Sequence, residues 1–254
     1  RLSGNSNINF FKSLTEINSK NSLVFNSVFK GELNKSELWQ HFQGIEIETP
    51  KDIFDDEILN LMDFNCDQRN DIHFFYTLPI NRNTALIETT WLSDLKDNSL
   101  MDYDLQLENY IKNNLGIKNY KINFTEKGAI PLFYPSFKDD DKTINIGSAG
   151  GMTRLSTGYT FLNIQEHSKY IVENIHEIKK IKSFNIGKKY QFLDRVFLRV
   201  LKKHPEKMPE IFLGMFKTPS NTVIKFLSNK SNIFEDINII SKMPKLIFIR
   251  ALLN

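Results

Sequence analysis

Two apolar runs joined by a short polar segment form the clearest pattern in the chain. Residues 73–80 and 84–91 are rich in aromatic and β-branched side chains, and an Asn-Arg-Asn segment separates them. This pattern predicts a β-hairpin. If Ile80 pairs with Thr84, the alternation of side chains along each strand places six residues on one surface. These residues are Phe74, Tyr76, Leu78, Leu86, Glu88 and Thr90.

Glu88 is the carboxylate of this predicted surface. Aromatic and aliphatic neighbours keep water away, so they disfavour the charged form of a carboxyl group and raise its pKa. Such a group can act as an acid near neutral pH. The alternative interpretation is a glutamate on a solvent-facing strand, because antiparallel sheets often keep one face in water. The pattern alone leaves both interpretations open.

Other segments predict further strands and helices. Alternation indicates strands at 23–27, 38–48 and 120–124. Apolar residues three or four positions apart predict a helix over 102–114, which Gly116 ends. The chain therefore combines strands and helices.

The C-terminal third of the chain changes to helical patterns. A long amphipathic helix is predicted to begin at Ser156 or Thr157 and to end near Ile181. An apolar stripe over 192–201 and several short apolar segments separated by prolines follow it. These stripes predict either ordinary helix packing or, because basic residues accompany them, helices that lie on a bilayer surface.

A glycine-rich turn lies between the strand and helix patterns of residues 144–161. Gly147, Gly150, Gly151 and Gly158 permit backbone angles that other residues avoid, and they let a ligand lie against the chain. A helix that begins after the turn leaves its first amide groups unpaired and directed at the ligand. The pattern therefore predicts either an anionic or hydroxyl-rich cofactor in the turn or a capped helix after a plain loop.

Length and composition restrict the class of protein. The chain has 254 residues, 41% apolar content and 21 Phe, which suffice for one large or two small domains. The net charge of +3 is too small to indicate nucleic acid as a partner. A single cysteine, Cys66, excludes a disulfide framework. No run approaches the length of a membrane span, and there is no signal peptide.

The order of residues in the glycine-rich turn is more specific than its glycine content. Gly-Ser-Ala-Gly-Gly-Met followed by Ser-Thr-Gly-Tyr resembles the second flavin-binding motif of the lycopene cyclases, a branch of the flavoproteins with the p-hydroxybenzoate hydroxylase fold. Ser148 stands where most of those flavoproteins carry Asp, and Leu155 stands where Pro is usual. The resemblance implies that the turn packs along the ribityl and isoalloxazine parts of FAD. The cofactor-binding residues that it implies are Gly147, Ser148, Ala149, Gly150, Gly151, Met152, Thr157 and Gly158.

Further segments are similar to the same family and occur in the family's order. Tyr-Thr-Leu-Pro and Leu-Ile-Glu-Thr-Thr resemble the strands around the family's proposed acid–base glutamate, so the resemblance implies that Glu88 is catalytic. Residues 126–132 are similar to a family segment whose Gly and Pro fix a turn beside the flavin ring. Asn26 and Val28 depart from the Asp and Arg that the family carries near the first strand. The expected walls of the substrate pocket are Phe74, Tyr76, Trp91 and Glu126.

The resemblance implies a mixed α/β (α+β) chain that forms the C-terminal portion of a p-hydroxybenzoate hydroxylase-like flavoprotein. No Gly-x-Gly-x-x-Gly followed by an acidic residue is present, so the βαβ unit for the ADP half of the cofactor is expected outside this sequence. The implied division is 1–30 as a remnant of the FAD domain, 31–125 as a substrate-binding β-sheet domain, 126–185 as the second FAD-binding segment and long helix, and 186–254 as a C-terminal helical region.

The implied activity is that of a lycopene β-cyclase, which closes each ψ-end of lycopene to a ring without a change of oxidation level. The implied cofactor is reduced FAD with NAD(P)H as reductant, and the implied location is the cytoplasmic side of the inner membrane, bound peripherally to its surface. Two alternatives stay open. One is an FAD-dependent isoprenoid or lipid reductase or hydroxylase of the same fold, and the other is an inactive membrane-associated fragment.

Overall fold

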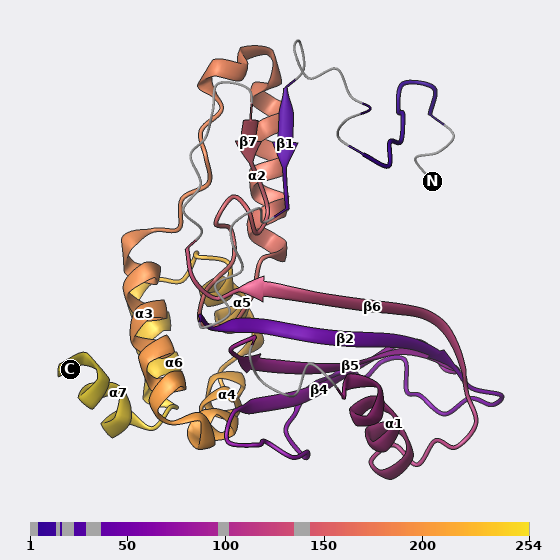
Figure 1. Ribbon diagram of the computed structural model, residues 1–254. Helices are drawn as coiled ribbons and strands as arrows, with labels where there is room; N and C mark the ends of the chain where they lie inside the picture. The colour runs from indigo at the N-terminus through magenta and orange to yellow at the C-terminus, as the bar shows by residue number, and fades with distance from the viewer. Residues whose placement is uncertain are drawn as a thin grey trace.

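A five-stranded antiparallel sheet forms the centre of the molecule. The computed structural model describes residues 5–13, 16, 23–28, 37–95, 102–134 and 143–253. The strand order is β3-β4-β5-β2-β6, with β6 at one edge (Figure 1). The strands are β2 (Trp39–Glu48), β3 (Asn60–Asp63), β4 (Ile72–Asn81), β5 (Thr84–Ser93) and β6 (Lys121–Pro131). The mixed α/β class expected from the sequence, with an antiparallel sheet, is confirmed.

The hairpin of β4 and β5 has the predicted register over most of its length. Tyr76 pairs with Glu88, and Phe74 pairs with Thr90. The pairing of Ile80 with Thr84 was wrong, because the register shifts after Pro79 and Asn81 pairs with Thr84 instead. The shift is confined to the end of the hairpin, so the six predicted residues still share one face.

Helix α1 (Tyr103–Asn113), which the sequence predicted over residues 102–114, covers the other face of the sheet. Its buried residues include Leu107, Tyr110 and Ile111, which pack with Phe75 and Ile87 in one apolar cluster. The rings of Tyr110 and Phe75 are stacked with their centroids 3.9 Å apart. This layer makes one face of the sheet part of the core and leaves the opposite face for the site described below.

Strand β6 is longer than predicted and contains no turn at residues 126–131. Gly128 pairs with Phe42, and Pro131 pairs with Trp39. A Cβ atom on Gly128 would lie only 2.6 Å from Cζ of Phe42, so glycine is required for side-chain packing across the strands. The expectation that Gly128 and Pro131 fix a turn is therefore wrong.

A second, two-stranded parallel sheet joins β1 (Val24–Asn26) to β7 (Thr143–Asn145). In Figure 1 this pair and helix α2 (Phe161–Asn174) stand above the large sheet, on the side of β6. Helix α2 begins later than predicted and is followed by the 3-10 segment η4 (Ile175–Lys180). The predicted domain boundary at residues 30/31 lies outside the described residues.

The late start of α2 has a local cause. Residues 154–158 form turns in which the Gly158 amide donates to the Arg154 carbonyl. Gly158 has a φ of +69°, which interrupts the right-handed path that a helix needs. The N-cap is therefore Thr160, and the helix starting at Ser156 or Thr157 was a wrong prediction.

Short helices form the C-terminal part of the chain. They are α3 (Lys188–Lys203), η5 (Pro205–Lys207), α4 (Met208–Phe216), α5 (Ser220–Leu227), α6 (Ile233–Ser241) and α7 (Lys245–Leu253). Their buried side chains share one apolar cluster with Ile72, Phe74 and Leu92 of the sheet. The helices thus pack on the Glu88 face of the sheet, at the end where β4 begins. None of the described helices combines the length and the apolar character needed to cross a membrane.

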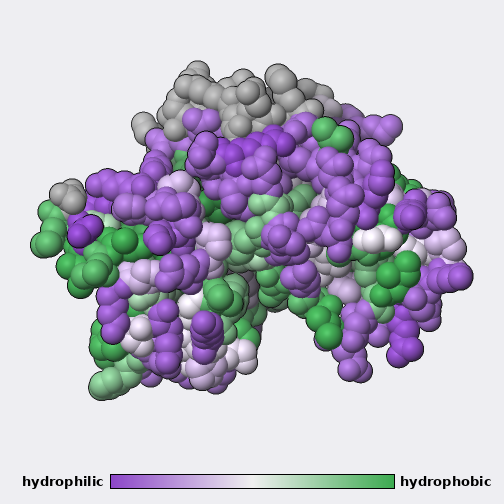
Figure 2. All heavy atoms as spheres, turned by 90° about the horizontal axis from the view of Figure 1, so that it is seen from below, coloured by the Kyte–Doolittle hydropathy of each residue, from purple (hydrophilic) through white to green (hydrophobic). Residues whose placement is uncertain are grey.

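Helices α6 and α7 also expose apolar side chains to solvent. Figure 2 shows hydrophobic atoms at the surface of the end of the molecule that the C-terminal helices form. Phe234 is 80% exposed and Leu253 is 83% exposed. We refer to the exposed apolar residues of these two helices as the C-terminal apolar face, which consists of Ile233, Phe234, Ile237, Ile240, Leu246, Ile249, Leu252 and Leu253.

A buried ion pair joins the glycine-rich segment to α3. Arg154 and Asp194 have side chains with no exposed area, and Nη2 of Arg154 donates to Oδ1 of Asp194 over 2.7 Å. The Leu155 amide and the Ser156 hydroxyl also donate to this carboxylate, at 3.1 and 2.7 Å. The guanidinium lies 4.8 Å from the ring centroid of Phe226. The carboxylate of Asp194 therefore has its acceptor positions filled without water.

Replacing Asp194 by Ala is expected to lower the free energy of unfolding by about 3–5 kcal/mol, because it leaves a buried guanidinium without a counter-charge. The matched control is Glu173→Ala, which removes the exposed partner of Lys169. That change should cost less than about 0.5 kcal/mol. Urea unfolding of both variants measures the difference, and equal losses would contradict the structural role of the Arg154–Asp194 pair.

Candidate active site

Four residues from four strands form one row across the Glu88 face of the sheet. Tyr76 on β4 pairs with Glu88 on β5, Glu88 pairs with Gly44 on β2, and Gly44 pairs with Glu126 on β6. Paired residues point to the same face of a sheet. The structure thus brings together three of the residues predicted for the site, and it adds Gly44 between the two carboxylates.

Burial raises the pKa of Glu88 to about 7 from its ordinary value of 4.5. The Thr90 hydroxyl, which donates to Oε1 of Glu88 over 2.6 Å, opposes this shift, and the charge of Glu126 reinforces it. Burial and the charge of Glu88 also raise the pKa of the Tyr76 hydroxyl. A carboxyl group with a pKa near 7 holds its proton in a substantial fraction of molecules at neutral pH.

Gly44 provides the space that Glu126 occupies. A Cβ atom at Gly44 would lie 3.2 Å from both Cγ and Oε1 of Glu126. The side chain of Glu126 therefore lies over the glycine, in the direction of β5 and Glu88. Sequence reasoning did not identify Gly44, because its importance depends on the pairing of β2 with two strands that are distant in sequence.

Trp91 does not belong to this face. Its partner on β4 is His73, and the two rings are stacked at 3.9 Å. Its indole N–H donates to Oε1 of Gln106 on α1 over 3.0 Å. Because successive side chains alternate, Trp91 points to the α1 side of the sheet and Phe74 to the Glu88 side. The predicted place of Trp91 in the wall of the Glu88 pocket is therefore wrong.

The glycine-rich turn contains backbone conformations that favour glycine. Gly147 and Gly151 have φ values of +57° and +67°, which side chains disfavour. A Cβ atom at Gly150 would lie 2.5 Å from the carbonyl oxygen of Asn145, so glycine is required there for packing. At Gly151, no atom of the described residues lies within 4 Å of that position. The turn is tightly folded on one side and open on the other.

The remaining predicted cofactor residues divide between half-buried and buried positions. Ser148 is half-buried, whereas Ala149 and Met152 are buried in the turn. The thioether sulfur of Met152 lies 3.2 Å from the Gly147 amide, so Met152 supports the turn from inside. Open Gly151 and half-buried Ser148 are therefore the parts of the turn that a ligand can contact.

The second half of the motif contacts the sheet directly. A Cβ atom at Gly158 would overlap Oε1 of Gln40, at 1.9 Å. Gln40 lies four residues before Gly44 on β2, about 13 Å along the strand. Gln40 pairs with Leu92 and Ile130, and it shares the Glu88 face. The motif therefore lies at the end of the face that carries Glu88.

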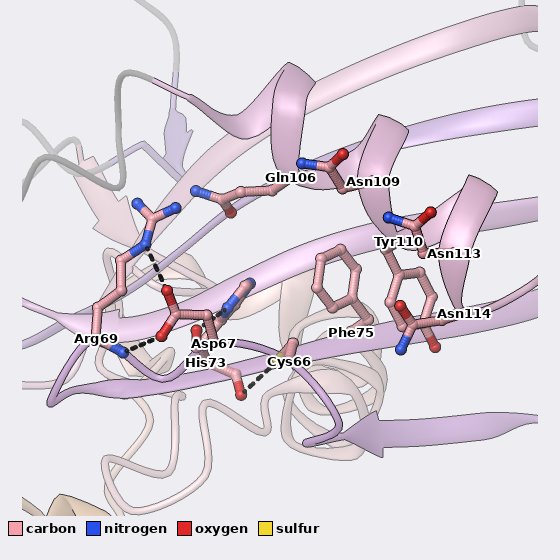
Figure 3. A pocket seen from close by; sticks show the side chains of 10 residues that line it. All are labelled: Cys66, Asp67, Arg69, His73, Phe75, Gln106, Asn109, Tyr110, Asn113 and Asn114. Carbon is pink, nitrogen blue, oxygen red and sulfur yellow. Dashed lines mark hydrogen bonds and ion pairs between the residues drawn. The ribbon is translucent and has the colours of Figure 1, made fainter.

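The α1 side of the sheet has a polar cavity of its own (Figure 3). It has a volume of about 260 Å³, and its lining includes Arg69, His73, Tyr110 and Asn114. Burial lowers the pKa of His73 to about 4, so this imidazole is neutral near pH 7. The Glu88 row and this cavity lie on opposite faces of the sheet.

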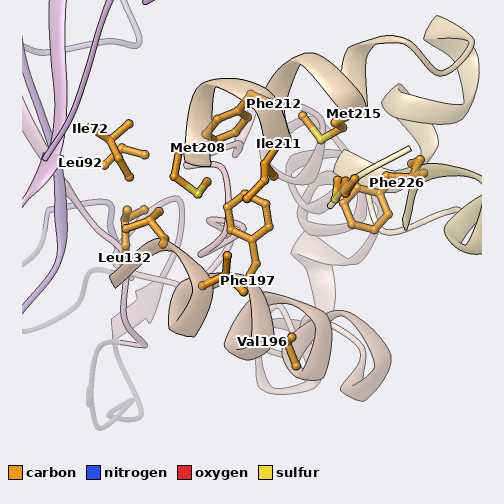
Figure 4. Close-up of a cluster of buried hydrophobic side chains, with 14 of the residues drawn as sticks. Ile72, Leu92, Leu132, Val196, Phe197, Met208, Ile211, Phe212, Met215 and Phe226 are labelled. Atoms are coloured by element: carbon orange, nitrogen blue, oxygen red, sulfur yellow. The ribbon is translucent and has the colours of Figure 1, made fainter. Parts of the chain in front are cut away.

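An apolar cavity of about 200 Å³ lies among the C-terminal helices. Figure 4 shows part of its wall, including Phe197 of α3, Met215 of α4 and Phe226 of α5. Thr157, one of the predicted cofactor residues, lines this cavity. The segment that follows the glycine-rich turn thus borders the apolar cavity.

Comparisons with known proteins agree with the sequence motifs. A family model described as Lycopene cyclase protein matches residues 13–253. No curated protein sequence matches the chain.

Solved structures show a more distant similarity. A geranylgeranyl bacteriochlorophyll reductase-like protein from Thermoplasma acidophilum is 14% identical with a TM-score of 0.46, and the match covers 86% of this chain and 55% of that one. The flavin-dependent brominase Bmp2 is 12% identical with a TM-score of 0.46, and the match covers 85% of this chain and 56% of the brominase. The chain thus spans just over half the length of these two structures.

The pKa of Glu88 makes the stability of the protein depend on pH. The folded state binds the proton of Glu88 more tightly than the unfolded state, so stability is full below pH 4.5 and decreases as pH rises to about 7. A Glu88→Gln variant lacks this loss, and above pH 7 it should be more stable than the parent by up to about 3 kcal/mol. Urea unfolding at pH 4 and pH 8 tests this expectation. If the free energies of unfolding of the variant and the parent differ by the same amount at both pH values, the expectation is wrong.

Proposed function

Because the chain belongs to the lycopene cyclase family, we propose that it closes the linear ψ-ends of lycopene to the rings of β-carotene in a redox-neutral reaction. Glu88 is the acid that starts the reaction. The observation that carries this proposal is a half-buried carboxyl group, with a pKa raised to about 7, on a face that leads to the glycine-rich turn. The fold is that of the p-hydroxybenzoate hydroxylase-like flavoproteins.

The reaction requires a proton, a dry pocket and a negative or π-rich surface. Protonation of an isolated alkene needs a group that still carries its proton near neutral pH, and Glu88 in its neutral form carries the proton on a carboxyl oxygen. The Thr90 hydroxyl fixes the orientation of that carboxyl group through the 2.6 Å hydrogen bond. Tyr76 and Phe74 offer aromatic surfaces, which attract a cation more strongly where water is excluded. These residues form the proposed wall of the pocket, together with Glu126.

FAD is the proposed cofactor, with NAD(P)H as its reductant. The residues that would hold it are those of the turn, with Gly151 and Ser148 at the open side and Gly147, Ala149, Gly150 and Met152 shaping the turn, and with Thr157 and Gly158 at the segment that meets Gln40. When bound, the reduced flavin supplies an electron-rich ring system beside the substrate. The positive φ angles and the open space at Gly151 fit the close approach of such a group.

A water-insoluble hydrocarbon substrate requires access from a membrane. The C-terminal apolar face offers a surface for peripheral binding, and Lys242 follows α6 while Lys245 begins α7. Cations beside exposed apolar side chains favour an anionic lipid surface. We therefore place the protein on the cytoplasmic surface of the inner membrane. The apolar cavity, whose lining includes Ile240 and Leu252 of the same two helices, is suited to an apolar chain.

Replacement of Glu88 by Gln should abolish ring closure, because the amide keeps the shape of the side chain and cannot donate the proton. The expected loss is at least about 10²-fold. The assay is pigment analysis of lycopene-accumulating bacterial cells that express the whole gene containing this sequence. The matched control is Glu108→Gln, an exposed glutamate of α1 on the other side of the sheet, which should leave conversion unchanged.

The same assay separates the cyclase from the alternative enzymes. Conversion of lycopene to β-carotene by the parent and by the Glu108→Gln variant supports the proposal. If the parent protein binds FAD and leaves lycopene unchanged, the cyclase function is wrong, and a reductase or hydroxylase of the same fold becomes the better explanation.

Replacing both Phe234 and Leu253 by Ser should weaken binding to anionic phospholipid vesicles by about tenfold or more, because two large side chains no longer leave water on binding. Ile58 and Leu59 are exposed to 61% and 58% and lie outside the C-terminal helices. Their double replacement by Ser is the matched control. Vesicle sedimentation measures both variants, and equal losses would contradict the assignment of the C-terminal apolar face to the membrane.

A further inference from the structure

In the row Tyr76–Glu88–Gly44–Glu126, the two glutamates lie on opposite sides of Gly44. Glu88 and Glu126 belong to strands on either side of β2, so their backbones are two strand spacings apart, about 10 Å. The side chain of Glu126 covers Gly44 and reduces this separation, since its Cγ and Oε1 lie 3.2 Å from the position of a Cβ atom there. Any larger residue at position 44 would stand between the two carboxyl groups.

We propose that Glu126 is the second catalytic carboxyl group of this site and accepts the proton that ring closure releases. This inference rests on the proposed ring closure. Glu126 in its charged form keeps the proton on Glu88 before the reaction, and it accepts the proton that the ring releases at the end. The negative charge of Glu126 raises the pKa of Glu88, because like charges repel in a poorly solvated site.

The proton balance of the proposed cycle closes without a further reactant. The proton of Glu88 moves to a terminal alkene carbon, whose electron pair forms the new C–H bond and leaves a tertiary cation. A second double bond of the substrate attacks this cation and closes the ring, which moves the positive charge to a ring carbon. A C–H bond next to that carbon breaks, its electrons form the ring double bond, and its proton goes to Glu126. Transfer of this proton from Glu126 to Glu88 restores the starting state.

The groups that face Glu88 make Glu126 the relevant neighbour. From β4 the facing titratable group is Tyr76, from β6 it is Glu126, and from β2 it is Glu46, one row farther along. Thr90 on β5 is neutral and donates to Glu88. Glu126 lies in the same row as Glu88, and its charge raises the pKa of Glu88. Glu46 offers a matched comparison, since it is a carboxylate on the same face.

Glu126→Gln should lower the pKa of Glu88 by about one unit, because it removes a negative charge from the row. Carbon-13 NMR titration of the whole protein with labelled glutamate measures this pKa, and the signal of Glu88 is the one that is missing in Glu88→Gln. The Glu46→Gln variant should cause a smaller shift, and Glu126→Asp should restore most of the parent value. This measurement does not depend on the identity of the substrate.

The kinetic test uses the vesicle-bound protein with lycopene. Glu126→Gln should lower kcat by roughly 10²-fold with little change in KM. It should also move the pH profile of kcat to lower pH, because the pKa of Glu88 falls in this variant. An unchanged pKa of Glu88 in Glu126→Gln, or full kcat in that variant, would overturn the proposal. A shifted pKa in a protein that closes no ring would support the carboxyl pair and overturn the cyclase function.

Discussion

The buried pair of Arg154 and Asp194 is the constraint on which the position of the site depends. Taking two charges out of water is costly unless each is fully satisfied. Here Asp194 accepts from the Arg154 guanidinium, from the Leu155 amide and from the Ser156 hydroxyl, while Arg154 also donates to the Phe226 carbonyl. The chain between the glycine-rich turn and α2 thus has one low-energy path. That path brings Gly158 against the sheet at Gln40.

The sheet supplies the rest of the geometry through its pairing. Two glycines of one face, Gly44 and Gly128, lie beside larger neighbours, and each provides space for a side chain from the adjacent strand. At Gly128 that side chain is the Phe42 ring, and at Gly44 it is the Glu126 carboxylate. Because the opposite face is filled by α1, the polar row remains on the side of the turn. A rigid sheet is well suited to hold two carboxyl groups at a fixed separation.

The sequence predicts the local part of this structure and misses the long-range part. Alternation and the short connection were enough for the register of Tyr76 with Glu88, and helical spacing was enough for α1. Alternation also puts Trp91 on the face opposite to Glu88, so the expectation that Trp91 lines the pocket did not follow the strand pattern. The roles of Gly44 and Gln40 depend on strands and turns that are distant in sequence. The start of α2 depended on the positive φ of Gly158, which overrides the apolar periodicity.

The raised pKa of Glu88 follows from the position of this residue in the sheet, and it also bears on the type of reaction that the protein can catalyse. A carboxyl group whose pKa is raised on folding must bind a proton or be buried as a charge at neutral pH. The environment of Glu88 therefore lowers the free energy of unfolding at neutral pH. A flavoprotein reductase or hydroxylase transfers electrons through its cofactor and has no need of a neutral carboxyl acid on this face. A redox-neutral cyclisation needs a protonated group at its first step, because the alkene receives a proton there, and a site with little water protects the cation that forms. The environment of Glu88 therefore favours the acid-dependent reaction over the redox reactions of related folds.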